Sequence, residues 1–450
     1  MNPFRLLRER RFGPFFWTQF LGAFNDNVYK NALIILIAYE LGSAAGSEGH
    51  VMINAAAGLF ILPFLLFSAT AGQIADKYDK AWLMRRIKLA EIAIMLLAAV
   101  ALMMKSAYAL IGLLFLMGAQ SSLFGPVKYA ILPQHLHRDE LVGGNGLVGM
   151  GTFLAILLGT LLGGLLIAVD GQGPAWVALT VVVLAMAGWL ASRGIPVARP
   201  ADPHLQIRWN IVTSSLANVR HLLGERIQLL TAVAISWFWF FGATLLTQIP
   251  NFTRLDLYAD ERVVTALLTA FSLGIGVGSL LVERLSRRRI VPRVALLGGA
   301  GMTGFGLLLP LLVMNVPPPE AAAALRGFGA FWSHGGGIIL AGVIGLGISG
   351  GLYIVPLFAL IQRRAPEASR SRVIAGVNIL NALFMVISAV VAGVLLGSGW
   401  QIPQLFALVA VLNLLLVSVV GWQLRRVLGH LGAIDESAER ATSSGAEAAS

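Results

Sequence analysis

Four polar residues interrupt the first long apolar segment of the sequence. They are Asn25, Asp26, Asn27 and Lys30, and the segment itself begins near Phe12. A helix rises about 1.5 Å per residue, so Asp26 lies roughly 21 Å along it, near the middle of a bilayer. An ionised carboxylate facing hydrocarbon at that depth costs at least about 2.5 kcal/mol, so Asp26 is expected to face a cavity or a partner. Asn25, Asn27 and Lys30 are candidate cavity residues together with it. The alternative is a structural ion pair between Asp26 and Lys30, which are one helical turn apart.

A further cation stands in the segment FGPVKYAILP, which runs from Phe124 to Pro133. Pro126 and Pro133 remove backbone hydrogen bonds and loosen the helix around Lys128. The ammonium group of Lys128 either faces the interior or extends along its aliphatic stem to the lipid headgroups. Position alone favours neither interpretation, so Lys128 is a candidate cavity residue.

The segment GQIADKYDK begins at Gly72 and follows the second apolar segment. A glycine at this position allows two helices to approach closely. Asp76 stands at the end of its helix and can face the positive N-terminal dipole of a neighbouring helix, with Lys77 and Lys80 beside it. Such a contact would close one side of the molecule and would break when the helices move apart. The alternative is that Asp76 only caps its own loop.

A weaker copy of this motif follows the eighth apolar segment, where Glu283 and Arg284 take the places of Asp76 and Lys77. Two further pairs of short matches, GAF with GAT and GGN with GVN, fall in corresponding segments and in the same order. The chain is therefore expected to consist of two homologous halves, which is a known plan of membrane transporters. Glu283 and Arg284 are expected to contact the fifth helix of the first half.

The composition requires a solvent other than water. Hydrophobic residues make up 57% of the 450 residues and charged residues only 12%, which is about half the charged share of soluble proteins. Repeated apolar segments of about 20 residues indicate a lipid bilayer. We therefore expect an all-α membrane protein with twelve transmembrane helices in two six-helix bundles. The expected helices cover residues 12–39, 51–75, 83–104, 107–132, 141–169, 174–193, 227–249, 263–283, 291–314, 335–361, 373–397 and 402–424.

Most of the 33 Lys and Arg residues fall in loops on the side that holds the N-terminus. This bias predicts that both termini are cytoplasmic, and it explains the net charge of +11 better than a nucleic-acid partner does. The expected organisation is a first bundle over 1–194, a cytoplasmic linker over 195–226, a second bundle over 227–425 and a disordered tail over 426–450.

Signals for other chemistry are weak. The chain has no cysteine, which excludes disulfides and thiolate metal sites, and no cofactor or metal ion is expected. It has no GxxxxGK[ST] segment, which argues against direct ATP drive. His135, His137 and Asp139 share a loop, but the spacing from His135 to Asp139 is one residue short of an acyltransferase HxxxxD motif.

Together and in this order, FLGAFNDNVYKNAL, GQIADKYDK and GPVKYAILP resemble the bacterial lysophospholipid transporter family of the major facilitator superfamily. The resemblance is closest to the transporter module that some bacteria fuse to a lysophospholipid acyltransferase and an acyl-carrier-protein synthetase. It implies that Asp26 and Lys128 are charged cavity residues, and that Asp76 faces the eleventh transmembrane helix, which begins near Arg372. The family also uses a cation in the seventh helix, whereas the matching stretch 242–248 has no charge here.

The resemblance implies a transporter that works by alternating access. It would move lysophospholipids such as lysophosphatidylethanolamine across the bacterial inner membrane for re-acylation, with H⁺ or Na⁺ as the coupling ion. An acyltransferase on the cytoplasmic side is a candidate partner. Two other hypotheses remain open at this point. One is an efflux transporter of small amphiphilic or cationic compounds, with Asp26 as its proton or cation site, and the other is a membrane enzyme that acts on lipids.

Overall fold

A computed structural model of the chain describes residues 3–37, 47–286, 291–314 and 325–447. Within these ranges the chain is helical, apart from loops and one isolated bridge between Ala259 and Arg326. The last residues of the expected first helix and of the expected tail, 38–39 and 448–450, lie outside the described residues.

The first half contains six long helices at the predicted positions. Several begin with a proline in the first turn, where a missing N–H costs nothing, as at Pro14 and Pro174. Asp79 caps the third of them by accepting a hydrogen bond of 2.6 Å from the backbone N–H of Trp82. The helices are α1 (Gly13–Leu36), α3 (Ser47–Lys77), α4 (Lys80–Met103), α5 (Ala107–Ala130), α7 (Leu141–Ile167) and α8 (Gly173–Arg193).

The second half repeats this pattern, and short helices fill the connections. The long helices are α10 (Arg226–Leu255), α11 (Glu261–Ser286), α12 (Pro292–Val313), α14 (Gly337–Arg364), α15 (Arg370–Gly397) and α16 (Ile402–Glu447). The short ones are α6 (Leu132–His135), α9 (Ile211–Leu223) and α13 (Phe328–Phe331).

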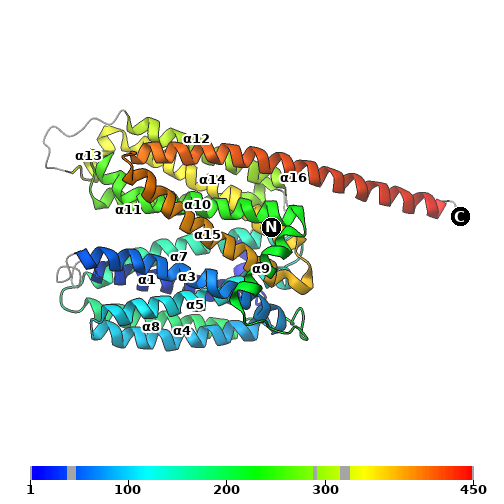
Figure 1. The fold of residues 1–450 in the computed structure, drawn as a ribbon, viewed down its shortest axis with the longest axis horizontal. Helices are drawn as coiled ribbons and strands as arrows, with labels where there is room; N and C mark the ends of the chain where they lie inside the picture. Colours follow the sequence, from blue (N-terminus) through cyan, green and yellow to red (C-terminus); the bar gives the residue numbers. More distant parts are fainter. Residues whose placement is uncertain (1–2, 38–46, 287–290, 315–324, 448–450) are drawn as a thin grey trace.

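Among the described residues, 10 helices are long and apolar enough to cross a membrane by length and composition. The two remaining members of the expected set are α1 and α4, which lie alongside the others in the bundle (Figure 1). Their charged residues explain why composition alone does not single them out. α1 holds the polar cluster around Asp26, and α4 holds Lys88 and Glu91 as well as charges in its first turns.

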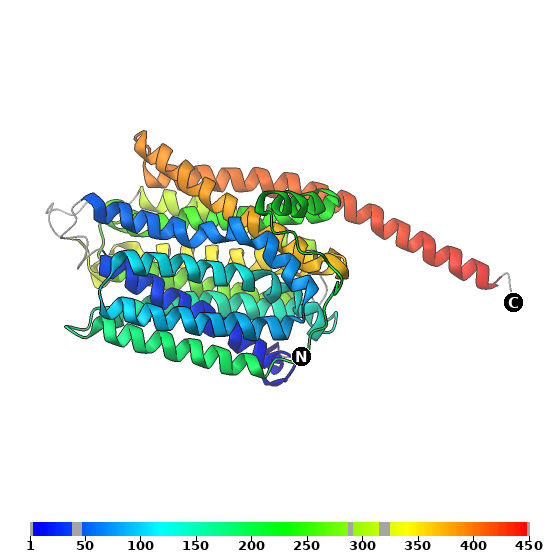
Figure 2. The ribbon, with the colours of Figure 1, turned by 60° about the horizontal axis from the view of Figure 1, so that its bottom comes forward.

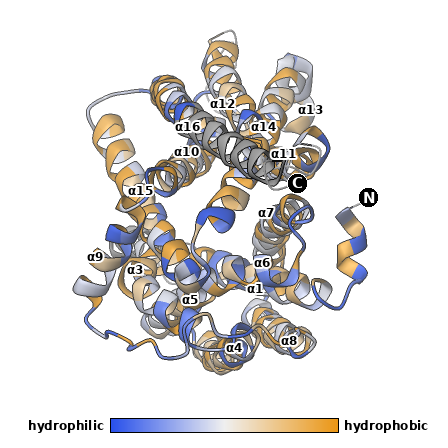
Figure 3. Ribbon diagram, turned by 90° about the vertical axis from the view of Figure 1, so that its right-hand side faces the viewer, coloured by the Kyte–Doolittle hydropathy of each residue, from blue (hydrophilic) through white to orange (hydrophobic). Residues whose placement is uncertain are grey.

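Each half packs mainly against itself. α1 contacts α7 and α8, and α4 contacts α5 and α8, while in the second half α14 contacts α11 and α12. The halves meet along two seams, α3 against α15 and α7 against α11. Figure 3 looks along the helices and shows α15 and α7 at opposite sides of the boundary between the two groups.

We call one end of the bundle the linker end, because residues 194–210 and α9 lie there, together with the C-terminal end of α3 and the first turns of α7 and α15. The N-terminus lies at the same end (Figures 1 and 2). Within the linker, α9 turns Asn218 and Leu222 inward. A side-chain carbon of Leu222 lies 2.9 Å from the position of a Cβ on Gly376, so this helix packs directly against α15.

Over residues 426–447 of the expected tail, the structure continues α16 as one helix that ends at Glu447 and projects beyond the bundle (Figure 1). Residues 426–447 contain no proline, and alanine, glutamate and arginine together make up nine of the 22 residues. These residue types have high intrinsic helix propensity. Polarity excludes the segment from a packed core, but it does not prevent a helix that has already started from continuing.

Candidate functional site

Asp76 connects the end of α3 to the start of α15. Its side chain is fully buried, and its two oxygens accept hydrogen bonds from the backbone N–H groups of Ser371 at 3.0 Å and Arg372 at 3.3 Å. The Arg372 Nε donates a further bond of 3.0 Å. The first N–H groups of a helix lack partners within the helix and carry positive partial charge, so a carboxylate suits them. Asp79 caps the next helix, α4, whereas the Asp76 side chain bonds to α15, so the alternative that Asp76 only caps its own loop is wrong.

The close approach of α3 and α15 depends on Gly72. A Cβ at this position would lie 2.6 Å from the Ala375 Cβ and 2.9 Å from the Ser371 carbonyl oxygen, both of which are too close. Neither lysine of the motif bonds to Asp76 in the described part of the chain, although the charges of Lys80 and Asp76 attract each other. The Nζ of Lys77 lies over the Tyr78 ring, 5.9 Å from its centroid. Lys80 is buried, and its Nζ has no hydrogen-bond partner in the described part of the chain.

The weaker copy of the motif lies in the equivalent place on the other seam. The Glu283 carboxylate faces the first turn of α7, where a Cβ on Gly143 would lie 2.7 Å from Glu283 Oε2. One turn further along, a Cβ on Gly146 would lie 2.6 Å from the carbonyl oxygen of Ser279. Glu283 therefore has the predicted position, whereas Arg284 is exposed.

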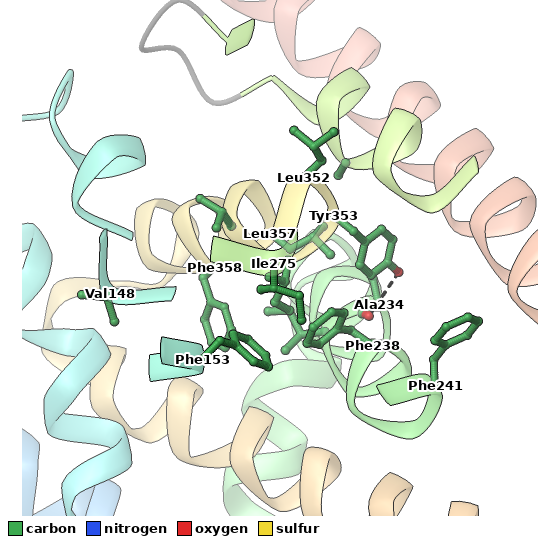
Figure 4. Packing of buried hydrophobic residues seen from close by; sticks show 14 of the residues in the cluster. Val148, Phe153, Ala234, Phe238, Phe241, Ile275, Leu352, Tyr353, Leu357 and Phe358 are labelled. Carbon is green, nitrogen blue, oxygen red and sulfur yellow. Dashed lines mark hydrogen bonds between the residues drawn. The ribbon is translucent and has the colours of Figure 1, made fainter. Parts of the chain in front are cut away.

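Further contacts between the halves lie next to these two helix ends. Asn145 of α7 and Gln362 of α14 exchange amide hydrogen bonds of 2.7 and 3.0 Å. The rings of Tyr129 and Phe358 stack with centroids 4.1 Å apart and planes 7° apart. Figure 4 shows Phe153 beside Phe358 and Phe238 in the adjoining apolar cluster. These contacts close the linker end, and a cavity of about 30 Å³ lies among them.

Asp26 faces the interior of the first half. Its Oδ2 accepts a 2.7 Å hydrogen bond from the Ser121 hydroxyl on α5, and its Oδ1 has no hydrogen-bond partner among the described residues. Lys128, also on α5, donates a 2.8 Å bond to Thr152 of α7, which in turn donates to Gln19 of α1 at 3.1 Å. The predicted carboxylate and cation therefore lie on facing helices of one bundle. They interact electrostatically but are not within ion-pair distance.

The other polar residues of α1 do not gather at Asp26. Successive helical residues point about 100° apart, so neighbours in sequence face different helices. Asn25 donates a 3.1 Å bond to Glu91 on α4, whereas the amide of Asn27 donates to the Ala23 carbonyl of its own helix. The Lys30 Nζ lies over the Phe60 ring, 5.5 Å from its centroid, and is beyond ion-pair distance of Asp26, although the two charges attract each other. Asn25, Asn27 and Lys30 thus contact other partners, and the structure shows no direct Asp26–Lys30 ion pair.

A charged pair on α4 was not identified from the sequence. Lys88 and Glu91 are 1% exposed and form a 2.6 Å ion pair. The Glu91 carboxylate also accepts a 3.0 Å bond from Gln120. The Gln120 amide oxygen lies 3.2 Å from the hydroxyl of Ser121, whose single proton can go either to it or to Asp26. The network therefore extends from α4 to Asp26. The i, i+3 spacing of opposite charges inside an apolar segment was the available signal.

A second ion pair secures the start of α1. Arg11 donates to the two carboxylate oxygens of Glu140 at 2.6 and 2.7 Å, and its Nε donates to Glu9 at 2.7 Å. The guanidinium holds the pKa of Glu140 below its usual range, and the hydrogen bonds to Glu140 raise the pKa of Arg11. The pair ties the segment before α1 to the residue before α7.

Comparisons with known proteins agree with this architecture. The Lysophospholipid transporter LplT of Enterobacter sp. (strain 638) is 29% identical over 358 residues, 77% of this chain and 78% of the relative. The protein of the same name from Pectobacterium carotovorum subsp. carotovorum (strain PC1) is 26% identical over 81% of each chain.

Two solved structures share the fold. The human organic anion transporter MFSD10 (TETRAN) matches with a TM-score of 0.70 at 14% identity, over 91% of this chain and 99% of that chain. A bacterial homologue of the iron transporter ferroportin in an outward-facing state matches with a TM-score of 0.61, also at 14% identity, over 90% and 98%. The family model for the Major Facilitator Superfamily matches residues 15–338. From its two helical halves, its seams and this match, we conclude that the chain belongs to the Major Facilitator Superfamily.

Proposed function

We propose that the protein moves lysophospholipids across the bacterial cytoplasmic membrane by alternating access. The relatives named as lysophospholipid transporters support this substrate class. In the proposed orientation the linker end faces the cytoplasm, which agrees with the bias of Lys and Arg toward the loops of that side. The imported lipid would then be re-acylated by an acyltransferase on the cytoplasmic side.

The observation that carries the proposal is the placement of two opposite charges on facing helices without a bond between them. Asp26 keeps one carboxylate oxygen without a hydrogen-bond partner in the described structure, and Lys128 donates to Thr152 and lies over the Tyr129 ring but contacts no carboxylate there. A zwitterionic headgroup supplies the missing partners, because its phosphate suits the ammonium of Lys128 and its amine suits the Asp26 carboxylate. The acyl chain can stay in lipid, so no headgroup charge crosses hydrocarbon.

The transport cycle follows from the closed linker end. A headgroup reaches Asp26 and Lys128 from the opposite side, and release to the cytoplasm requires the α3–α15 and α7–α11 seams to separate. Separation breaks the bonds from Asp76 to the first turn of α15 and moves Glu283 away from α7. Asp26 is also the group at which H⁺ or Na⁺ would couple to this change, because its free oxygen lies next to the buried network of α4.

The test is uptake of radiolabelled lysophosphatidylethanolamine into proteoliposomes, with recovery of the lipid to show that it is chemically unchanged. We expect Asp26→Asn and Lys128→Ala each to lower uptake by about tenfold or more, because a charge-assisted hydrogen bond contributes about 1.5–3 kcal/mol. Asp170→Asn and Lys105→Ala, which change exposed residues of the opposite end, are the matched controls.

Normal uptake in both variants would remove Asp26 and Lys128 from the substrate path. Recovery of an altered lipid would indicate a membrane enzyme. Uptake of small cationic compounds without uptake of lysophospholipid would indicate the efflux transporter instead.

A further inference from the structure

A cavity of about 770 Å³ opens at the linker end, on the outer side of the closed seam. Three parts of the chain form its walls: residues 133–141 from the first half, 197–199 from the linker, and 362–370 from the second half. The cavity is distinct from the interior site, because neither Asp26 nor Lys128 lines it. Part of the loop that contains His137 lines the cavity, and this loop has no role in the proposed transport cycle.

The cavity wall is strongly basic. Its charged side chains are four arginines and one glutamate, with His137 beside them: Arg138, Arg199, Arg363, Arg370 and Glu367. In the described part of the chain, none of these arginines has a carboxylate within ion-pair distance. By contrast, the nearby Arg11 and Arg372 are paired with Glu140 and Asp76.

Arg370 stands at the first position of α15, and its Nε is buried without a hydrogen-bond partner in the described structure. Leaving a charged donor in this state costs free energy, and the attraction of Glu367 and Asp76 does not give its Nε a hydrogen-bond acceptor in the described structure. An anion in the cavity supplies that acceptor. Guanidinium groups bind phosphate in particular, because their planar forks match two of its oxygens at once.

We propose that this cavity binds a phosphate-bearing anion and that the bound anion holds the linker end closed. Arg138 belongs to the first half, Arg199 to the linker, and Arg363 and Arg370 to the second half. These four cations surround one space only while the seams are shut. A ligand that binds one conformation better than another shifts the population toward it by its differential affinity. The anion therefore regulates the cycle from outside the substrate path.

Two sources can supply this phosphate chemistry. One is the headgroup of an anionic lipid, and the other is a soluble phosphorylated compound. The experiment uses purified full-length protein in nanodiscs of phosphatidylcholine, with inorganic pyrophosphate as the soluble probe. Parallel nanodiscs contain phosphatidylglycerol and no pyrophosphate. Because the chain has no cysteine, Tyr108→Cys and Met314→Cys can carry spin labels at the opposite end of the bundle, where these side chains are 79% and 80% exposed.

We expect one or both probes to shift the measured label distances toward the longer values of a molecule that is closed at the linker end. In the variant Arg138→Gln/Arg363→Gln, the pyrophosphate concentration for half of the shift should rise at least tenfold. The matched control is Arg220→Gln/Arg293→Gln, which removes two exposed arginines that do not line the cavity.

A shift with phosphatidylglycerol alone assigns the site to a lipid headgroup, and a shift with pyrophosphate alone assigns it to a soluble compound. If neither probe shifts the distances, or if the control variant loses the response equally, the proposal is wrong. An acidic peptide that shifts the distances where both phosphate probes fail would indicate a protein partner and would also overturn it. The readout needs no lysophospholipid, so it stands or falls independently of the proposed substrate.

Discussion

A lysine and a glutamate buried together in a bundle are difficult to justify by stability alone. Lys88 and Glu91 are removed from both water and lipid headgroups, and desolvation of the two charges offsets much of their attraction. Their additional bonds, from Asn25 and Gln120 to the carboxylate, reduce this cost. Gly22 makes room for the pair, because a Cβ there would lie 2.3 Å from the Lys88 Nζ. The pair therefore fixes how α1, α4 and α5 fit together.

This arrangement predicts that removing one member of the pair destabilises the protein more than removing both. Glu91→Leu leaves the Lys88 ammonium buried without its partner, and we expect a loss of about 3–5 kcal/mol in the free energy of unfolding. In Lys88→Met/Glu91→Leu both charges are gone, and most of that loss should disappear. Thermal unfolding of the purified variants in detergent measures both effects. Equal destabilisation in the single and double variants would mean that the cost comes from packing and not from the isolated charge.

A second prediction concerns Asp256, which follows the end of α10 and lies outside the membrane-spanning segment. One oxygen of its carboxyl group is buried without a hydrogen-bond partner in the described structure, and burial raises its pKa to about 6. The unfolded value is about 3.9. The folded state therefore holds this proton more tightly than the unfolded state does, and stability is lost as the pH rises from about 4 to about 6.

We expect Asp256→Asn to remove this component of the pH dependence. The difference in Tm between the variant and the unchanged protein should be small near pH 4 and should grow in favour of the variant up to about pH 6. Asp260→Asn, at another partly buried aspartate of the same loop, is the control. A constant Tm difference across this pH range would contradict the buried, protonated carboxyl group.

The sequence was sufficient to select Asp26, Lys128, Asp76 and Glu283 as candidates, because a charge in an apolar segment or at a helix end has few acceptable positions. It did not predict which helix each polar side chain faces. Asn25 and Asn27 flank Asp26 in sequence but point elsewhere, since one residue rotates the side chain by about 100°. Rotation about the helix axis is set by packing between helices, which no local pattern records.

At the scale of the elements, the two halves use the same device twice. A carboxylate at the end of the second long helix of one half meets the first turn of the fifth long helix of the other half. Asp76 does this at α15 and Glu283 at α7. The contact is polar, and its attraction falls off once the carboxylate leaves the first turn of the helix. It therefore stabilises the closed linker end but can be broken more easily than an apolar interface.

Weakening either helix-end contact should therefore open the linker end. We expect Asp76→Asn to shift the population toward the open state by about tenfold or more, because charge-assisted hydrogen bonds contribute about 1.5–3 kcal/mol each. Glu283→Gln should act in the same direction at the other seam. The label pair at Tyr108 and Met314 reports the change as a shortening of the measured distance.

Asp79→Asn is a useful control, because this residue caps α4 and does not reach the second half. Its distance distribution should match that of the unchanged protein. Should Asp76→Asn leave the distribution unaltered as well, the helix-end contact would have no role in closure.

Helix positions followed well from apolar length, and the described bounds agree with them within several residues at most ends. The exceptions have physical causes. Charges in the first two turns of α4 resemble a loop in sequence, yet the helix starts at Lys80 because Asp79 caps it and Lys88 finds Glu91. In the linker, α9 forms where Asn210 caps the chain by accepting from the Thr213 N–H at 3.0 Å. Composition described that segment only as polar.

At the scale of the whole molecule, the described contacts between the halves lie toward the linker end. They include the bonds of Asp76, the Asn145–Gln362 amide pair and the Tyr129–Phe358 stack. A transporter that alternates must release all of these together, because each spans the same boundary. One covalent bond across either seam should therefore stop the cycle, even when it lies far from the substrate site.

The α7–α11 seam offers a suitable pair of positions. A Cβ placed on Gly149 would lie 3.6 Å from the Cβ of Ser279, within the roughly 3.5–4.5 Å that a disulfide requires. Because the chain contains no cysteine, Gly149→Cys/Ser279→Cys introduces only the intended pair. We expect uptake by the oxidised variant to fall by at least about tenfold, and dithiothreitol to restore it, since reduction frees the halves to separate. Each single cysteine variant, treated in the same way, should transport normally. Full uptake by a variant whose disulfide is verified by mass spectrometry would show that the cycle does not require this seam to open.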